Sequence, residues 1–388
     1  MNRFALQTAP EALADLRARL RGTRWPDSPE DAGWSLGTDI DYLRELVTYW
    51  AEEFDWLAQE AALNEFPHFR MRLGGIGIHF VHVRATAPIG PVMPIVLSHG
   101  WPDSFWRYSK VISLLTNPGD HGADPADAFD VVIPDIPGFG YSEAPTVRLL
   151  NSINVADLWA ELMAILEYPL FGAAGGDHGS SVSRYLGLNH ADRVVAVHRM
   201  DAGLPVFTGD TTELSPEERS WIDGALAWGA TEGAYGAMHR TKPQTIAFGL
   251  TDSPTGLAAW IVEKLRAWSD CDGDIERRFT KDEILTNVTI YWLTGTIGSS
   301  MRSYHANAAI PLGQHSRRVE VPSGFSIFRG DIVRPPMAWL ERIANVVYAT
   351  EPPRGGHFAP FEEPELYARE LRDFFRPFRD VLAGQDAG

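Results

Sequence analysis

An aspartate stands at the centre of a glycine-flanked turn in the segment Phe171-Gly-Ala-Ala-Gly-Gly-Asp-His-Gly-Ser180. In the pattern Gly-x-Ser-x-Gly, a nucleophilic serine occupies the same position on a sharp strand-to-helix turn. A turn this tight needs residues without bulk on either side, and Gly175 and Gly179 supply them. The central side chain is then exposed at the end of the strand, so Asp177 is the predicted nucleophile.

A carboxylate nucleophile suits one kind of reaction. Attack on an acyl carbon would give a reactive anhydride, whereas displacement at a saturated carbon gives an alkyl ester on the enzyme. Water cleaves such an ester when a histidine removes its proton, and backbone N–H groups stabilise the oxyanion that forms. The sequence must therefore also supply a histidine and an oxyanion hole.

The histidine is best placed at His357, in the glycine-rich segment Arg354-Gly-Gly-His-Phe358. An acid that orients the imidazole should follow an earlier strand, and the segment 324–331 is typical of a strand that runs directly into Asp331. Three other carboxylates near this end of the chain stay open as alternatives: Glu351, Glu362 and Glu363. The order along the chain is then Asp177, Asp331, His357.

The oxyanion donors are expected on two loops. The segment Ser98-His-Gly-Trp-Pro-Asp-Ser-Phe105 follows the apolar run Ile95–Leu97 and leaves the predicted sheet on the side of the active site. We assign the oxyanion hole to the backbone N–H of Trp101 and to that of His178, the residue immediately after the nucleophile.

The elements that position these residues alternate between strand and helix. Strand-like runs are predicted at 69–73, 76–83, 92–97, 131–134, 170–173, 194–200, 325–328 and 346–350, with helical segments between most of them. This alternation indicates an α/β protein with a mostly parallel sheet flanked by helices. Nucleophile, acid and histidine in this order, from successive strand ends, are typical of the α/β-hydrolase fold.

The chain divides into four predicted regions. Residues 1–65 form a helical N-terminal extension, with a Trp25-Pro26 break and one long amphipathic stretch from Asp39 to Leu57. Residues 66–204 and 313–388 form the two parts of the α/β core. Residues 205–312 are mainly helical, with a helix start at Ser215-Pro-Glu-Glu218, and are predicted to be a cap that covers the strand ends and excludes water.

The composition of the chain limits the classes of ligand and the cellular location that can be expected. The 388 residues carry a net charge of −17, which argues against nucleic acid or an anionic membrane as a ligand because phosphates would be repelled. Cys271 is the only cysteine, and neither a signal core nor a membrane-length apolar run is found, so a cytoplasmic location is expected. Motifs for metal or dinucleotide binding are lacking, so neither a metal nor a cofactor is predicted.

The chain resembles the epoxide hydrolases of the microsomal type, essentially from end to end. The residues that carry the resemblance are His99-Gly-Trp-Pro102, Gly175-Gly-Asp177, Gly355-Gly-His-Phe358 and the stretch 285–295. It implies that water converts an epoxide to a vicinal diol through a covalent aspartyl ester. In that family two cap tyrosines hold and protonate the epoxide oxygen, and the matching positions are Tyr235 and Tyr304. A phenol with a pKa of about 10 stays protonated at neutral pH and can protonate an alkoxide.

The chain departs from the family pattern at two positions. His178 stands where a tryptophan usually follows the nucleophile, and Asp103 stands where the loop usually has glycine. A finer resemblance to bacterial members of enediyne antibiotic biosynthesis implies an epoxide on an aryl-substituted carbon. On that reading Trp260 and Trp292 are expected to line an aryl-sized pocket.

Two other functions stay open. A haloalkane dehalogenase would use the same aspartate, but it should show indole or amide donors for the halide in place of paired tyrosines. A non-catalytic receptor of the same fold would bind a small molecule without turnover, because fold alone does not settle function. The sequence is compatible with a homo-oligomer.

Overall fold

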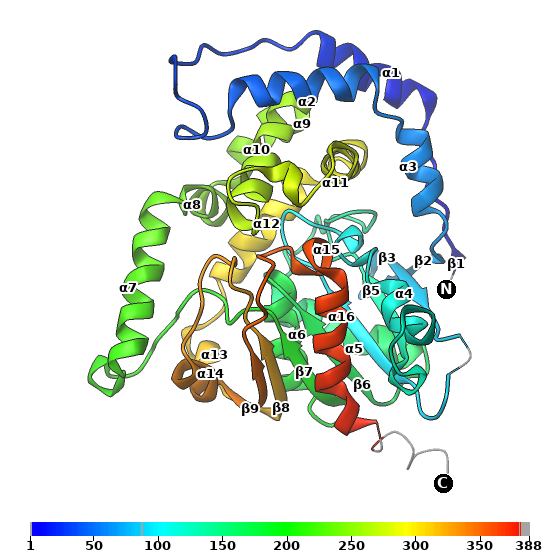
Figure 1. The fold of residues 1–388 in the computed structure, drawn as a ribbon, viewed down its shortest axis with the longest axis vertical. Helices are drawn as coiled ribbons and strands as arrows, with labels where there is room; N and C mark the ends of the chain where they lie inside the picture. The colour runs from blue at the N-terminus through cyan, green and yellow to red at the C-terminus, as the bar shows by residue number, and fades with distance from the viewer. Residues whose placement is uncertain (1, 87, 380, 382–388) are drawn as a thin grey trace.

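The protein is described by a computed structural model for residues 2–86, 88–379 and 381, and a nine-stranded sheet forms its centre (Figure 1). The strand order is β1-β2-β3-β5-β4-β6-β7-β8-β9. Neighbours from β5 to β9 pair in parallel, while β1, β2, β3 and β5 pair antiparallel. The bounds are β1 (Asn2–Arg3), β2 (His68–Leu73), β3 (Ile76–Val83), β4 (Met93–Ser98), β5 (Phe129–Pro134), β6 (Phe171–Gly175), β7 (Val194–Arg199), β8 (Val319–Ser326) and β9 (Ala344–Thr350).

All eight predicted strands are present, and their ends differ by a few residues from the prediction. The largest difference is in β8, which begins at Val319 and ends at Ser326. The sequence analysis was wrong to extend this strand directly into Asp331. The chain leaves the sheet earlier because Gly330 forms an isolated parallel bridge with Gly356, and the N–H of Asp331 donates to the carbonyl of Phe328 at 3.1 Å.

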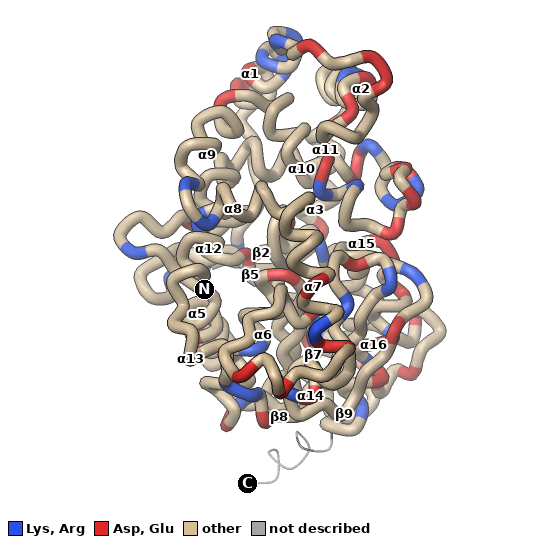
Figure 2. The backbone as a smooth tube through the Cα atoms, turned by 90° about the vertical axis from the view of Figure 1, so that its left-hand side faces the viewer, with Lys and Arg blue, Asp and Glu red and all other residues tan. Residues whose placement is uncertain are grey.

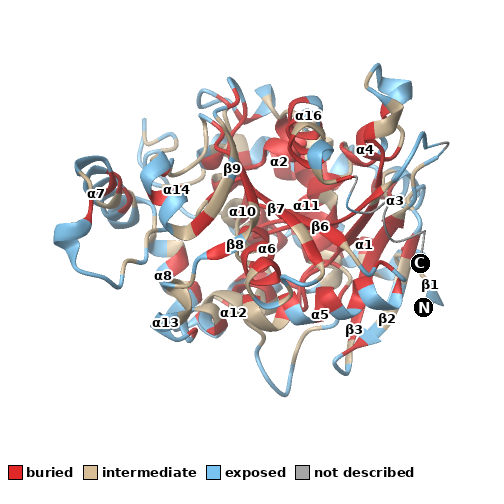
Figure 3. Ribbon diagram, turned by 90° about the horizontal axis from the view of Figure 1, so that it is seen from below, coloured by how far each residue is buried: buried red, intermediate tan, exposed pale blue. Residues whose placement is uncertain are grey.

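Helices cover both faces of the sheet, which explains why its central strands are apolar throughout. Every residue of β4 and β6 is buried, and Figure 3 shows the buried strands surrounded by helices with exposed outer faces. Helices α5 (Ser152–Ile165) and α6 (His178–Asn189) pack on one face, and α4 (Ile112–Thr116) and α16 (Pro364–Phe375) on the other (Figure 1). The arrangement is the α/β-hydrolase fold that the sequence predicts.

The N-terminal region forms α1 (Pro10–Arg21), α2 (Ile40–Glu52) and α3 (Trp56–Leu63). The predicted amphipathic stretch is two helices, since the Asp55 side chain accepts hydrogen bonds from two backbone N–H groups and so starts α3. This region contacts the helices inserted between β7 and β8. The Thr38 hydroxyl donates to the carbonyl of Ala259 at 2.7 Å, and the Tyr49 hydroxyl donates to Asp282 at 2.8 Å.

Helices dominate the segment between β7 and β8. They are α7 (Pro216–Thr231), α8 (Ala234–Thr241), α9 (Pro243–Asp252), α10 (Pro254–Trp268), α11 (Lys281–Thr294), α12 (Ile297–Ala308) and the short α13 (Leu312–His315). The predicted start of α7 is confirmed by a capping box, in which Ser215 and Glu218 exchange side chain-to-backbone hydrogen bonds. Two more helices, α14 (Met337–Ile343) and α15 (Ala359–Glu362), belong to the C-terminal part.

Charged residues are distributed over the whole molecule. Figure 2 shows acidic and basic positions interspersed along both the sheet region and the helices above it. Across residues 2–86, 88–379 and 381, the structure has no helix with the length and apolar content needed to span a membrane.

Candidate active site

Asp177 lies at the sharp turn between β6 and α6, with φ 56° and ψ −125°. Positive φ is strained for a residue with a side chain, and such strain often occurs where a fold presents a reactive group. The N–H of Asp177 donates to Oδ2 of Asp201 at 2.7 Å, which holds the turn in place. Gly179 lets the turn close, because a Cβ there would lie 1.8 Å from the carbonyl oxygen of Ser98.

The loop after β4 lies directly against the nucleophile. A Cβ on Gly100 would approach the Asp177 side chain to 2.3 Å, so only glycine fits there. The N–H of Trp101 donates to Asp177 Oδ1 at 2.9 Å, as expected for a donor of the oxyanion hole. In the described part of the chain, no hydrogen bond joins the N–H of His178 to either Asp177 oxygen, so that donor stays a prediction.

The structure brings His357 between two carboxylates. Its Nε2 lies 3.6 Å from Asp177 Oδ2, and its Nδ1 lies 2.9 Å from Asp331 Oδ1. The imidazole is buried, whereas 19% of the Asp177 side chain remains exposed. The geometry therefore selects Asp331 as the orienting acid from the carboxylates that the sequence left open.

Glu362 has a different place in the site. Its carboxylate accepts hydrogen bonds from the backbone N–H groups of Gly356 and Phe358, on either side of His357, at 3.1 and 2.9 Å. It also accepts one from the N–H of Asp270 at 2.8 Å. Glu362 thus fixes the backbone that carries the imidazole.

Arg107 gives the same loop a second support. Its guanidinium is buried, pairs with Asp103 and donates to the carbonyl oxygen of His357. Asp103 is one of the two departures from the family pattern, and its partner follows one helical turn later. The pair ties the loop after β4 to the histidine loop.

Charges in the site are strongly coupled. Burial alone would raise the pKa of Asp177, but His178, His357 and the N–H of Trp101 together hold it well below its usual value. Burial likewise opposes a charged imidazole, yet Asp331 and Asp177 raise the pKa of His357 to about 10. At neutral pH the free protein therefore holds an ionised Asp177 beside an imidazolium.

Tyr235 of α8 and Tyr304 of α12 meet above the nucleophile in one aromatic group with Trp101. The Tyr235 ring stacks on Trp101 with centroids 5.5 Å apart, and the Tyr304 ring meets Trp101 edge-on at 6.1 Å. Burial is the main cause that raises the pKa of Tyr235 above its usual value, and the charge of the Asp177 carboxylate raises it further. Burial also raises the pKa of Tyr304. The Tyr304 hydroxyl is buried and has no hydrogen-bond partner among the described residues.

His239 of α8 is a site residue that the sequence analysis missed. Its fully buried ring lies 4.8 Å from both Trp101 and Tyr304 and 5.4 Å from Tyr235. Burial lowers the pKa of His239 to about 3, so the ring is neutral. His239 lies one turn after Tyr235 on the same helix, but this spacing alone does not show that the ring meets Trp101.

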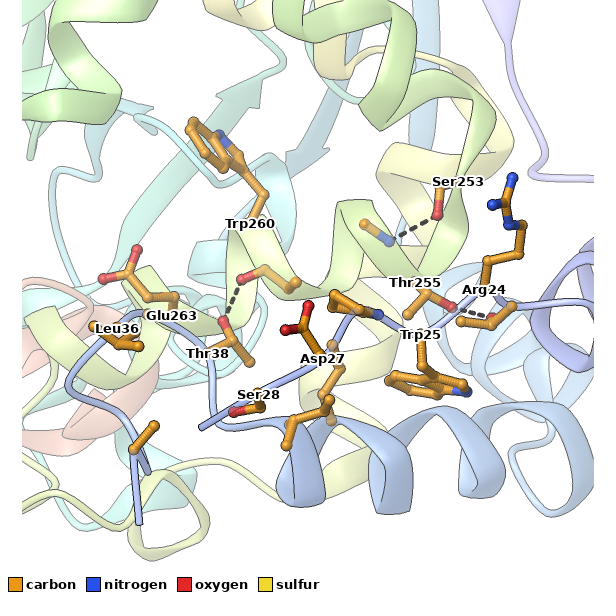
Figure 4. Close-up of a pocket in the computed structure, with 18 of the residues that line it drawn as sticks. Arg24, Trp25, Asp27, Ser28, Leu36, Thr38, Ser253, Thr255, Trp260 and Glu263 are labelled. Carbon is orange, nitrogen blue, oxygen red and sulfur yellow. Dashed lines mark hydrogen bonds between the residues drawn. The ribbon is translucent and has the colours of Figure 1, made fainter. Parts of the chain in front are cut away.

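Trp260 connects this aromatic group to a separate cavity. Its indole N–H donates to Nε2 of His239 at 3.3 Å, and the residue also lines a cavity of about 590 Å³. The cavity lies between α10 and the N-terminal loop that carries Trp25 and Asp27, and Figure 4 shows the Trp260 indole pointing away from that loop. The role of Trp260 in substrate binding stays a prediction.

Trp292 lies elsewhere. The guanidinium of Arg19 on α1 covers its ring at 5.7 Å, and within the described residues it has no aromatic contact with Trp101, Tyr235 or Tyr304. The structure therefore does not bring Trp292 into the aromatic group. Its position in the family-like stretch 285–295 gave no indication of which helix face it occupies.

No group of three or more histidine, cysteine, aspartate or glutamate side chains is placed to hold a metal ion in the part of the chain that the structure describes.

A strand-to-helix turn that presents Asp177, with His357 and a second carboxylate from later strand ends, places the chain in the class of α/β-hydrolases. Family comparisons agree with this class. The family described as "Epoxide hydrolase N terminus" matches residues 1–108, and that described as "alpha/beta hydrolase fold" matches residues 93–231.

Individual relatives narrow the class further. A protein of Stigmatella aurantiaca, provisionally named an epoxide hydrolase, is 41% identical over 97% of this chain and 85% of its own length. Epoxide hydrolase 1 of Oryctolagus cuniculus is 36% identical over 96% of this chain and 88% of its own. The crystal structure of juvenile hormone epoxide hydrolase from Bombyx mori superposes with a TM-score of 0.85 at 28% identity, covering 98% of this chain and 94% of that one. The chain belongs to the epoxide hydrolases of the microsomal type, and it is an epoxide hydrolase.

Proposed function

We propose that this enzyme hydrolyses its epoxide through a covalent ester on Asp177. Oδ2 of Asp177 attacks an epoxide carbon, the carbon–oxygen bond of the ring breaks, and the released alkoxide takes a proton from Tyr235 or Tyr304. The observation that carries this proposal is the position of Asp177, whose Oδ1 is bound by the Trp101 N–H while Oδ2 faces His357. One oxygen is thus held and the other is left to react.

The second half of the reaction releases a vicinal diol. His357 takes a proton from water, and the resulting hydroxide attacks Cγ of Asp177 while Oδ1 becomes an oxyanion. The bond between Cγ and Oδ2 then breaks, and the leaving alkoxide takes the proton back from His357. Oδ2 leaves with the diol, so one oxygen of the restored carboxyl group comes from water. The proton that this carboxyl group then loses returns to the tyrosinate, which restores the starting state.

The site's electrostatics support this order of steps. His357 is an imidazolium while Asp177 is ionised, because both neighbouring carboxylates raise its pKa. Ester formation removes the charge of Asp177 and leaves Asp331 as the charged partner. The pKa of His357 then falls, and the neutral base needed for the second step becomes accessible.

The two tyrosines favour an epoxide over a halide as the leaving group. An alkoxide is much more basic than a phenolate, so a buried phenol with a raised pKa remains acidic enough to protonate it. A halide needs no proton when it leaves. The paired cap hydroxyls would have little purpose in a dehalogenase.

We further propose a hydrophobic, aryl-substituted epoxide as the substrate class. The groups around the nucleophile are aromatic, and Trp260 joins them to the cavity of Figure 4. A role in antibiotic biosynthesis is part of this proposal, and it rests on the sequence resemblance alone.

A single-turnover reaction with styrene oxide in oxygen-18 water tests the covalent route. We expect one heavy oxygen in the Asp177 carboxylate and an unlabelled diol, as detected by peptide and product mass spectrometry. Label that appears directly in the diol would contradict the proposal. Halide release from haloalkanes, without diol formation from epoxides, would instead indicate a dehalogenase, and binding without either product would indicate a receptor.

A further inference from the structure

The side chain of His178 lies between the nucleophile and the cap. Its Nδ1 lies 3.0 Å from Nδ2 of Asn307, and its Nε2 lies 3.2 Å from the hydroxyl of Ser303. The same Nε2 lies 3.9 Å from Oδ1 of Asp177. Both cap residues belong to α12, so this helix fixes the direction of the imidazole.

The neighbours of Asn307 determine which way its amide points. The backbone N–H of Ser152 can only donate, and it lies 2.8 Å from Oδ1 of Asn307. The oxygen of the amide therefore faces Ser152, and the NH2 group faces His178. Because that group donates, Nδ1 of His178 must accept and carries no proton.

The other ring nitrogen is fixed by Ser303. Its hydroxyl donates its one proton to the carbonyl oxygen of Ser300 at 2.6 Å, so it can only accept from His178. Nε2 of His178 therefore carries the proton. Burial lowers the pKa of His178, which agrees with a neutral ring. The hydrogen bonds thus select one neutral tautomer, whose N–H donates to Ser303 and whose Nε2 lies 3.9 Å from Oδ1 of Asp177.

We propose that the His178 side chain is a catalytic third donor to the oxyanion, which forms on Asp177 Oδ1 during ester hydrolysis. This inference rests on the proposed covalent route. Oδ1 is the oxygen bound by the Trp101 N–H, so it is the atom on which negative charge develops. A ring movement of about 1 Å from Ser303 toward Oδ1 would bring Nε2 within hydrogen-bonding distance.

The charge on Oδ1 predicts a specific kinetic signature. The free carboxylate shares one negative charge between its oxygens, the ester oxygen is neutral, and the tetrahedral intermediate carries the full charge on Oδ1. A donor at this position therefore stabilises the intermediate more than the ester and accelerates hydrolysis. It also stabilises the free carboxylate more than the ester, so it gives no acceleration of ester formation.

Rapid-mixing kinetics of His178→Phe and His178→Gln with styrene oxide test this inference. For His178→Phe we expect ester hydrolysis to slow by about 10- to 100-fold. This loss is smaller than the loss caused by removing a donor that already contacts the oxyanion, because His178 must first move toward Oδ1. Ester formation should stay unchanged or become faster, so the covalent ester should accumulate. His178→Gln, which keeps an N–H donor, should recover part of the hydrolysis rate. The exposed His121→Gln serves as the matched control and should leave both steps unchanged.

A second variant and a spectroscopic measurement do not depend on the packing of residue 178. Ser303→Ala removes the competing acceptor and should leave hydrolysis equal or faster. Nitrogen-15 NMR of labelled histidine should show His178 protonated on Nε2 alone near neutral pH. Equal slowing of both steps in His178→Phe, slower hydrolysis in Ser303→Ala, or a proton on Nδ1 would each overturn the inference.

The proposed function can fail separately from this inference. If wild-type enzyme incorporates no heavy oxygen into Asp177, the covalent route is wrong whatever the tautomer of His178. If the label is incorporated as expected and His178→Phe hydrolyses the ester at the wild-type rate, only the role of His178 is wrong.

Discussion

Nε2 of His357 lies 3.6 Å from Oδ2 of Asp177, so in the proposed route the general base of the second step faces the oxygen that reacts in the first step. In this route, the water molecule that attacks Cγ of Asp177 must lie within hydrogen-bonding reach of Nε2 of His357, while the Trp101 N–H binds Oδ1. The proposed route therefore assigns ester formation to the carboxylate and hydrolysis to the imidazole, so that variants can test each half-reaction separately.

The first prediction is that His357→Gln traps the ester. Glutamine cannot accept the proton of water, so hydrolysis should slow by about 10²- to 10⁴-fold while ester formation continues. Intact-protein mass spectrometry after mixing with styrene oxide should show one added substrate mass per chain. Asp177→Asn is the control, since an amide is a poor nucleophile, and it should show no added mass. Rapid turnover by His357→Gln would contradict the assigned base.

The second prediction concerns stability and pH. Asp331 and Asp177 raise the folded-state pKa of His357 to about 10, against an unfolded value of about 6.5. The imidazolium therefore stabilises the folded protein fully below the unfolded value, and this contribution is lost as the pH rises toward about 10. The difference in melting temperature between wild type and His357→Gln should be larger at pH 6 than at pH 10. A constant difference would show that the ion pair is absent.

The third prediction concerns the buried pair of Arg107 and Asp103. Arg107→Met should reduce the free energy of unfolding by about 3 kcal/mol, because it leaves the Asp103 carboxylate buried without its partner. It also removes the donor to the His357 carbonyl, so ester hydrolysis should slow. Urea unfolding measures the first effect and rapid-mixing kinetics the second.

The double variant Asp103→Gly with Arg107→Met separates the two effects. It removes both charges and restores the glycine usual in the family, so most of the lost stability should return. Hydrolysis should stay slow, because the His357 carbonyl still lacks its donor. If the double variant is as unstable as Arg107→Met alone, an unpaired carboxylate is not the cause.

The sequence could predict that Asp177, Asp331 and His357 lie together, because each depends on local patterns. The glycines around Asp177 indicate a tight turn. The carboxyl ends of the strands of a parallel sheet all lie at the same edge. The order of the strands therefore brings Asp331 and His357 to the same place, although the two residues follow different strands. The exact end of β8 was misjudged because it depends on the bridge between Gly330 and Gly356.

Residues that act across the boundary between cap and core gave no comparable signal. His239 reaches Trp101 only because α8 packs over the loop after β4, and the sequence separates the two residues by more than one hundred positions. The contact between Asn307 and His178 arises in the same way. Helical periodicity predicts that a face is buried but not which loop it meets, which is also why Trp292 was misplaced.

The final prediction contrasts the two tryptophans. Trp260→Ala should remove the indole between the cavity of Figure 4 and His239, and so widen the approach to the aromatic group. We expect the ratio of kcat/KM for stilbene oxide to kcat/KM for styrene oxide to rise by roughly tenfold. This magnitude is typical of one pocket contact, which is worth about 1–3 kcal/mol. Trp292→Ala is the matched control, because its ring contacts Arg19 instead, and it should leave that ratio unchanged. Equal shifts in both variants would contradict a passage past Trp260.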